Sequence, residues 1–139
     1  MGWSPLIFTF VDGAEVPVPV DGALVRAVLE PHAVGDPPLT AASDEGLYFL
    51  VRAADGGEAE VYVGERDIMV SRPHAGGVFG IVAELVSRLG AVVLDPSDGA
   101  VVCRAEEYAH LPVGMRDAAV VVEMTGEALE TALIGPRRP

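Results

Sequence analysis

The stretch whose residue types are most suited to binding or catalysis is a glycine-rich turn at residues 71–80, SRPHAGGVFG, which leads into an amphipathic segment. Backbone N–H groups at the start of a helix bind phosphate when glycines let the ligand approach and a cation lies nearby. Arg72 and His74 supply cationic groups, and Gly76 and Gly77 supply accessible backbone. These four residues are a candidate site for phosphate or another small ligand.

The same stretch departs from the nucleotide-binding motifs. No Lys-Ser or Lys-Thr pair follows the glycines, and the spacing is G-G-x-x-G rather than G-x-G-x-x-G. The structural interpretation is that the glycines turn the chain and that Gly80 lets the following helix lie close to a sheet. We favour this structural role and keep ligand binding as the alternative.

The single cysteine, Cys103, has Arg104 beside it and His110 seven residues further on. A nucleophilic thiolate needs an electropositive setting and a base, but the sequence does not bring these groups together. We therefore expect a buried, unreactive thiol.

Glu106 and His110 are four residues apart and would share one face of a helix. A zinc site needs further ligands, and neither His32 nor His74 has a matching spacing. HExxH and GxSxG are absent from the sequence. We predict no catalytic residues, no metal and no cofactor.

A second candidate surface involves two tyrosines. Tyr48 and Tyr62 lie on neighbouring predicted strands and can face the same side of a sheet, with the acidic residues Glu58, Glu60 and Glu65 around them. Exposed tyrosines are enriched at protein interfaces, so these five residues predict a partner-binding patch. The alternative is that the rings only pack at the rim of the sheet.

The formal net charge of −12 and the isoelectric point near 4.4 restrict the possible partners. All nine basic residues are arginine, and lysine, asparagine and glutamine are absent, a composition typical of a high-GC bacterial genome. Strong acidity argues against binding to nucleic acid or anionic lipid, because both need a basic face. A partner chosen by charge would be basic, although acidity also serves solubility alone.

The length of the chain, 139 residues, predicts a single domain. One cysteine allows no internal disulfide, which fits the reducing cytoplasm. The N-terminal segment lacks the pattern of a secretory signal, and no apolar run is long enough to cross a membrane. We expect a cytoplasmic protein.

Residues 1–46 form the less regular part of the predicted domain. A strand is expected at 6–11, an edge strand or extended connector at the VPVPV segment 16–20, and a helix after the capping residue Asp21. The proline-rich segment 31–46 reads as a loop.

Residues 47–104 carry the clearest pattern and form the predicted core. The runs GLYFLVRA, AEVYVG and DIMVSR, joined by short turns, predict an antiparallel meander. A helix with apolar residues at three- and four-residue spacing ends at Gly90, and AVVL and AVVCR then form a hairpin.

Beyond Arg104 we expect one helical turn at 106–111, a strand at 118–124, a helix after Thr125 and a mobile tail at 136–139. Together the pattern predicts an α+β fold: a two-layer domain with a mostly antiparallel sheet of four to seven strands and two or three helices packed on one face.

These observations favour a non-enzymatic binding protein of the inhibitor or immunity type that engages a basic partner. A small-ligand-binding domain, enzymatic or not, centred on the turn at residues 72–80 is the first alternative. A structural homodimer that pairs exposed strand edges is the second.

Overall fold

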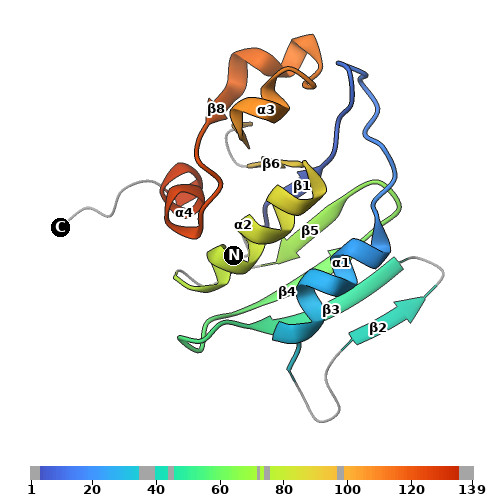
Figure 1. Cartoon of the computed structure of the whole chain (residues 1–139), viewed down its shortest axis with the longest axis vertical. Helices are drawn as coiled ribbons and strands as arrows, with labels where there is room; N and C mark the ends of the chain where they lie inside the picture. The colour runs from blue at the N-terminus through green and yellow to red at the C-terminus, as the bar shows by residue number, and fades with distance from the viewer. Residues whose placement is uncertain are drawn as a thin grey trace.

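The computed structural model describes residues 4–34, 40–43, 46–71, 73, 76–96 and 99–134. Eight strands form one sheet in the order β2-β3-β4-β5-β1-β6-β7-β8. The strands are β1 Leu6–Phe8, β2 Thr40–Ser43, β3 Gly46–Arg52, β4 Glu58–Val63, β5 Ile68–Ser71, β6 Val92–Leu94, β7 Val101–Cys103 and β8 Ala119–Val121. The helices are α1 Gly22–Leu29, α2 Val78–Leu89, α3 Ala105–Tyr108 and α4 Gly126–Ile134, with 3-10 turns η1 Glu30–His32 and η2 Val113–Ala118 (Figure 1).

Most neighbouring strands are antiparallel, and β8 pairs in parallel with β7. Strand β1 lies between β5 and β6 and is antiparallel to both, so β5 and β6 run in the same direction. The unit β5-α2-β6 therefore connects two parallel strands that are separated by the N-terminal strand. The α+β class with a mostly antiparallel sheet is confirmed.

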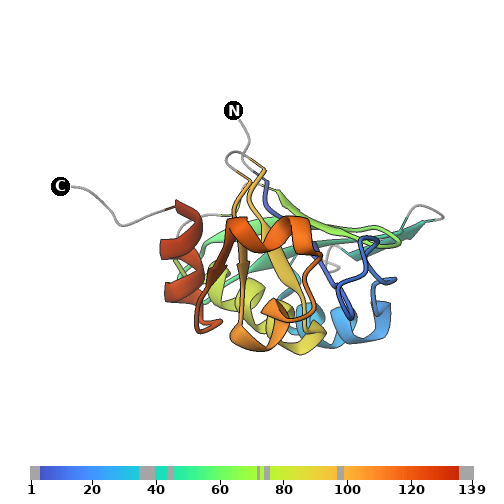
Figure 2. The same ribbon diagram turned by 90° about the horizontal axis from the view of Figure 1, so that it is seen from above.

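Helices α1, α2 and α4 pack together on one side of the sheet (Figure 2). Local signals fix where they begin and end, as the sequence predicts. The side chain of Asp21 accepts the Leu24 N–H at 3.1 Å, and the hydroxyl of Thr125 accepts the Ala128 N–H at 3.1 Å. Gly90 ends α2 in a left-handed conformation, with φ at 62°.

Alternation along the strands separates the two faces of the sheet. The residues buried beneath the helices include Phe49, Val51, Val61 and Val63. A smaller apolar cluster on the opposite face, at the end formed by β6, β7 and β8, packs beneath the segment that carries α3 and η2. Its buried members are Phe10, Val92, Val101, Cys103 and Leu111. Over β3, β4 and β5, this opposite face has no covering helix among the described residues (Figure 2).

The structure corrects two details of the sequence prediction and decides a third. The segment 31–46 is not only a loop, because it contains part of η1 and the edge strand β2. The sheet has eight strands rather than four to seven. Of the two alternatives for segment 16–20, the structure has the extended connector, and the Val20 N–H donates to the Glu65 carbonyl at 2.8 Å. The predicted tail at 136–139 lies outside the described residues.

None of the helices in the described parts of the chain is both long and apolar enough to span a bilayer.

Candidate functional site

The uncovered sheet face carries a pair of tyrosines in direct cross-strand register. Tyr48 of β3 lies opposite Tyr62 of β4, with ring centroids 5.1 Å apart and ring planes inclined by 52°. The turn that joins these strands contains Gly56 at φ 92°. The register of β3 with β4 places both tyrosine rings on the face opposite to that of Phe49 and Val61. The predicted shared face of the two tyrosines is thus present.

Glu60 links the two phenol groups. The Tyr62 hydroxyl donates to Oε2 of Glu60 at 2.6 Å, and the Tyr48 hydroxyl donates to the same oxygen at 3.3 Å. Burial, and then the charge and hydrogen bond of Glu60, raise the pKa of Tyr48 above its ordinary value of 10.0. Both rings are therefore held by one carboxylate that stays at the protein surface.

The other two predicted acidic residues stand apart from this group. Glu58 lies opposite Arg52 and accepts its Nε–H at 2.7 Å, so the charge of Glu58 is compensated. Glu65 lies in the turn between β4 and β5 and is exposed. The structure thus gathers Tyr48, Glu60 and Tyr62 into one cluster, which we call the tyrosine cluster. It places Glu58 and Glu65 outside that cluster.

The surroundings of the tyrosine cluster are partly apolar. Tyr62 itself is 40% exposed, and its partner on β5 is the half-buried Met69. Leu50 lies opposite Glu60, and Leu6 of β1 lies opposite Met69. The result is an amphipathic surface, because the same sheet face also carries the ion pair of Arg52 and Glu58 at the end of β3 and β4.

The glycine-rich turn presents amide groups that are already bonded within the chain. The Gly77 N–H donates to Oδ2 of Asp55 at 2.7 Å, and the Gly76 N–H donates to Oε1 of Glu130 at 3.1 Å. These carboxylates come from the β3–β4 turn and from α4, so they occupy the helix N-terminus as a bound anion would. Arg72 and His74 lie outside the described residues.

An open hollow of about 380 Å³ adjoins this turn, and its ionisable lining consists of His32, Asp55 and Glu84. Glu84 is paired with Arg88, but the carboxylate of Asp55 repels phosphate, which would have to displace it to reach the Gly77 amide. Ligand binding at this turn remains a prediction, and the local charges do not favour an anion.

Gly80 does not provide the expected close approach to the sheet. A Cβ placed on Gly80 would meet no atom within 4 Å, whereas one placed on Gly126 would lie 2.6 Å from the Gly80 backbone nitrogen. The absence of a side chain on Gly126 thus lets the start of α4 approach the backbone of α2 at Gly80. This contact was not predicted, because the two glycines are far apart in the sequence.

Cys103 is fully buried, and burial followed by the charge of Glu107 raises the pKa of its thiol. The neighbouring Arg104 is bonded to Glu107 through two contacts of 2.5 and 3.0 Å. The guanidinium therefore compensates a buried carboxylate and does not activate the thiol. The three-residue spacing of Arg104 and Glu107 is the sequence signal from which this ion pair could have been predicted.

His110 forms its hydrogen bond with Asp12, in the N-terminal part of the chain, and not with the predicted neighbour Glu106. Its Nδ1 accepts the Asp12 N–H at 3.0 Å, and Asp12 adopts a left-handed conformation with φ at 54°. Among the described residues, no three His, Cys, Asp or Glu side chains are grouped as metal ligands would be.

Comparisons of the chain with models of protein families, with curated proteins and with solved structures found no match.

Proposed function

We propose that this chain is a non-enzymatic protein-binding module of the inhibitor or immunity type, acting in the cytoplasm, that engages a basic protein through the tyrosine cluster. One observation carries the proposal: the hydroxyls of Tyr48 and Tyr62 converge on a single carboxylate oxygen of Glu60 on the uncovered sheet face.

This arrangement suits recognition because the rings are ordered before a partner arrives. Tyrosine provides a large amphipathic contact area with few rotatable bonds, and the bonds to Glu60 further restrict both rings. Less side-chain entropy is then lost on association. A lysine or arginine of the partner would pair with Glu60 while its aliphatic portion covers the rings.

The charge distribution supports a basic partner. Each arginine in the described part of the chain is bonded within the chain: Arg26 to Glu30, Arg52 to Glu58, Arg66 to the Pro17 carbonyl, Arg88 to Glu84, Arg104 to Glu107 and Arg116 to the Leu111 carbonyl. Because the sequence has 21 acidic and nine basic residues, most carboxylates have no arginine to pair with, and the net charge is −12. A field of one sign raises the association rate of an oppositely charged protein.

The proposal is tested with the immobilised protein and an extract of its source cells. A retained basic protein should be released between about 0.1 M and 1 M salt, because the Debye length then falls from about 10 Å to about 3 Å. Glu60→Gln should retain less of it, since the amide keeps the hydrogen-bond acceptor but removes the charge.

Glu84→Gln on α2 is the matched control, because it removes the same charge from an exposed site on the helix side. Equal losses in the two variants would mean that only net charge matters. The proposal would be contradicted if the amount of retained protein changed neither with salt concentration nor with Glu60→Gln.

A further inference from the structure

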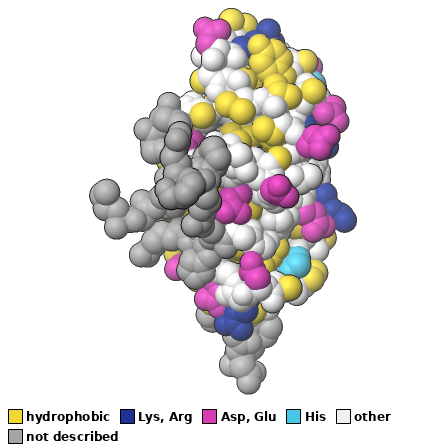
Figure 3. All heavy atoms as spheres, turned by 90° about the vertical axis from the view of Figure 1, so that its left-hand side faces the viewer, with side chains coloured by type: hydrophobic (Ala, Val, Ile, Leu, Met, Phe, Trp, Pro, Cys, Tyr) yellow, Lys and Arg dark blue, Asp and Glu magenta, His cyan; other side chains and the backbone are white. Residues whose placement is uncertain are grey.

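The strand β8 forms one edge of the sheet and has exposed apolar side chains. It is the last strand in the sheet order and pairs with β7. Val120 and Val121 are 40% and 50% exposed. Figure 3 shows hydrophobic side chains gathered in the upper part of the face that contains this edge. An exposed edge of this kind is a template for an additional strand.

The backbone of β8 has outward-pointing polar groups at a defined position. The Val122 N–H donates to the Cys103 carbonyl at 2.9 Å and therefore points toward β7. Because successive peptide groups of a strand point in alternate directions, the N–H and C=O of Val121 point to the outer side. An added strand would form its first hydrogen bonds with Val121.

A hollow lies on each face of this edge. The first, of about 590 Å³, lies between β8 and α4 and has Val120, Val122 and Ala128 in its apolar lining. The second, of about 490 Å³, lies beside the start of α3 and is lined in part by Val121 and Ala105. The side chains of an added strand would enter the two hollows alternately, since they point to opposite faces of the sheet.

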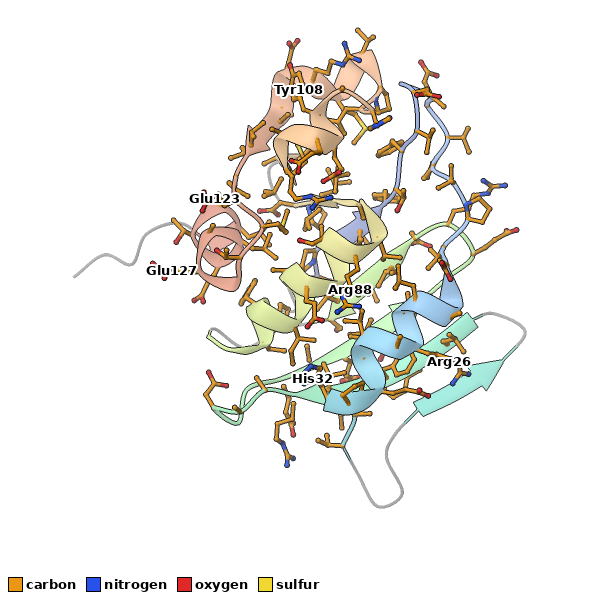
Figure 4. The ribbon with its side chains drawn as sticks, viewed as in Figure 1. Arg26, His32, Arg88, Tyr108, Glu123 and Glu127 are labelled. Atoms are coloured by element: carbon orange, nitrogen blue, oxygen red, sulfur yellow. The ribbon has the colours of Figure 1, made fainter. Side chains whose placement is uncertain are left out.

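Both hollows are acidic. Glu127 belongs to the first, Glu106 to the second, and Glu123 to both. In the described parts of the chain none of these three carboxylates forms an ion pair, and Arg104 in the second hollow is bonded to Glu107 while it also attracts Glu106 electrostatically. Figure 4 shows Glu123 and Glu127 at the side where β8 leads into α4, away from Arg26 and Arg88 on α1 and α2.

From this geometry we propose that β8 and its two flanking hollows bind an extended basic segment of another protein by strand addition. The segment places small apolar side chains over the valines and arginine or lysine side chains against Glu106, Glu123 and Glu127. A second copy of this chain fits less well, because it would bring the same acidic groups to the same edge. This surface is separate from the tyrosine cluster, which lies on β3 and β4 near the other end of the sheet.

The test uses a labelled peptide of about eight residues with alternating arginine and valine, and a glutamate–valine peptide as its charge-reversed control. Fluorescence anisotropy should show binding of the basic peptide alone. Val121→Pro should weaken binding about tenfold, because it removes the outward N–H and leaves the Val122 bond to β7 in place. Val121→Thr, which keeps the N–H, should bind within about twofold of the original protein.

Amide hydrogen exchange of the unmodified protein supplies a second measurement that does not depend on how well the proline variant folds. Exchange of the Val121 amide should slow when the basic peptide is added. Equal binding by Val121→Pro and Val121→Thr together with an unprotected Val121 amide would overturn the proposal, as would a protein that is dimeric through β8 and does not bind the peptide. Tyr62→Ala should leave peptide binding unchanged, so the result is independent of the tyrosine cluster.

Discussion

Gly126, at the start of α4, lies so close to Gly80 of α2 that a Cβ on Gly126 would come within 2.6 Å of the Gly80 nitrogen and 2.7 Å of its Cα. Backbone atoms rather than flexible side chains form this contact, so a side chain on Gly126 would force the backbones of the two helices apart. The pairing holds α4 against α2, and α4 in turn forms one wall of the hollow beside β8.

Gly126→Ala should therefore destabilise the protein by about 1–3 kcal/mol, the usual cost of overpacking a close contact. Gly80→Ala is the matched control. Its Cβ would meet no atom within 4 Å, and alanine should stabilise this exposed helical position by up to about 1 kcal/mol. Urea unfolding would measure both, and equal effects of the same sign would contradict the contact.

Asp55→Ala should lower the free energy of unfolding by about 1 kcal/mol, because the Gly77 N–H would lose its acceptor at the N-terminus of α2. Asp55→Asn should cost less, since it keeps an oxygen in place. Millimolar phosphate should not raise the Tm of the original protein, because Asp55 and Glu130 already occupy the amides. A phosphate-dependent rise in Tm that is lost in Arg72→Ala would instead support the ligand-binding alternative.

The free energy of unfolding should fall as the pH rises above 9.0, the ordinary pKa of a cysteine thiol. In the folded protein, burial and Glu107 raise the pKa of Cys103, so the unfolded chain releases the proton first. The associated stability is present below this pH and is lost above it. Cys103→Ala should show a smaller fall between about pH 8 and pH 10 in denaturant titrations. An unchanged pH dependence would indicate that the thiol does not contribute.

Ultraviolet titration of the tyrosines tests the geometry of the tyrosine cluster. Glu60→Gln should lower the pKa of Tyr48 toward 10.0, because it removes the negative charge that opposes ionisation while burial of the ring remains. Glu58→Gln is a suitable comparison, since Glu58 pairs with Arg52, whereas the Tyr48 hydroxyl donates to Glu60. If Glu60→Gln leaves the titration curve unchanged, the two side chains are not in contact in solution.

Sequence patterns were sufficient for the elements whose signals are local. The helices α1, α2 and α4 follow from Asp21, Gly90 and Thr125, and the meander follows from short turns between β-branched and aromatic runs. Strand β2 was predicted as part of a loop, because it lies in a proline-rich segment and pairs with β3 without a strand-like composition of its own.

The contacts that build the candidate sites could be predicted only in part. The cross-strand pair of Tyr48 and Tyr62 follows from turn length and alternation. The convergence of Asp55 and Glu130 on the glycine-rich turn does not, because it depends on how α4 packs against α2. The parallel pairing of β8 with β7 likewise depends on the tertiary path of residues 104–118 and leaves no local sequence signal.

The most direct test of the proposed function is the dissociation constant of the retained basic protein for Tyr62→Ala and for Tyr108→Ala. The two tyrosines have similar exposure, 40% and 38%, but Tyr108 lies on α3, far along the sheet from the tyrosine cluster. Tyr62→Ala should weaken binding at least about tenfold, and Tyr108→Ala should leave it nearly unchanged. Equal dissociation constants for the two variants would contradict recognition through the tyrosine cluster.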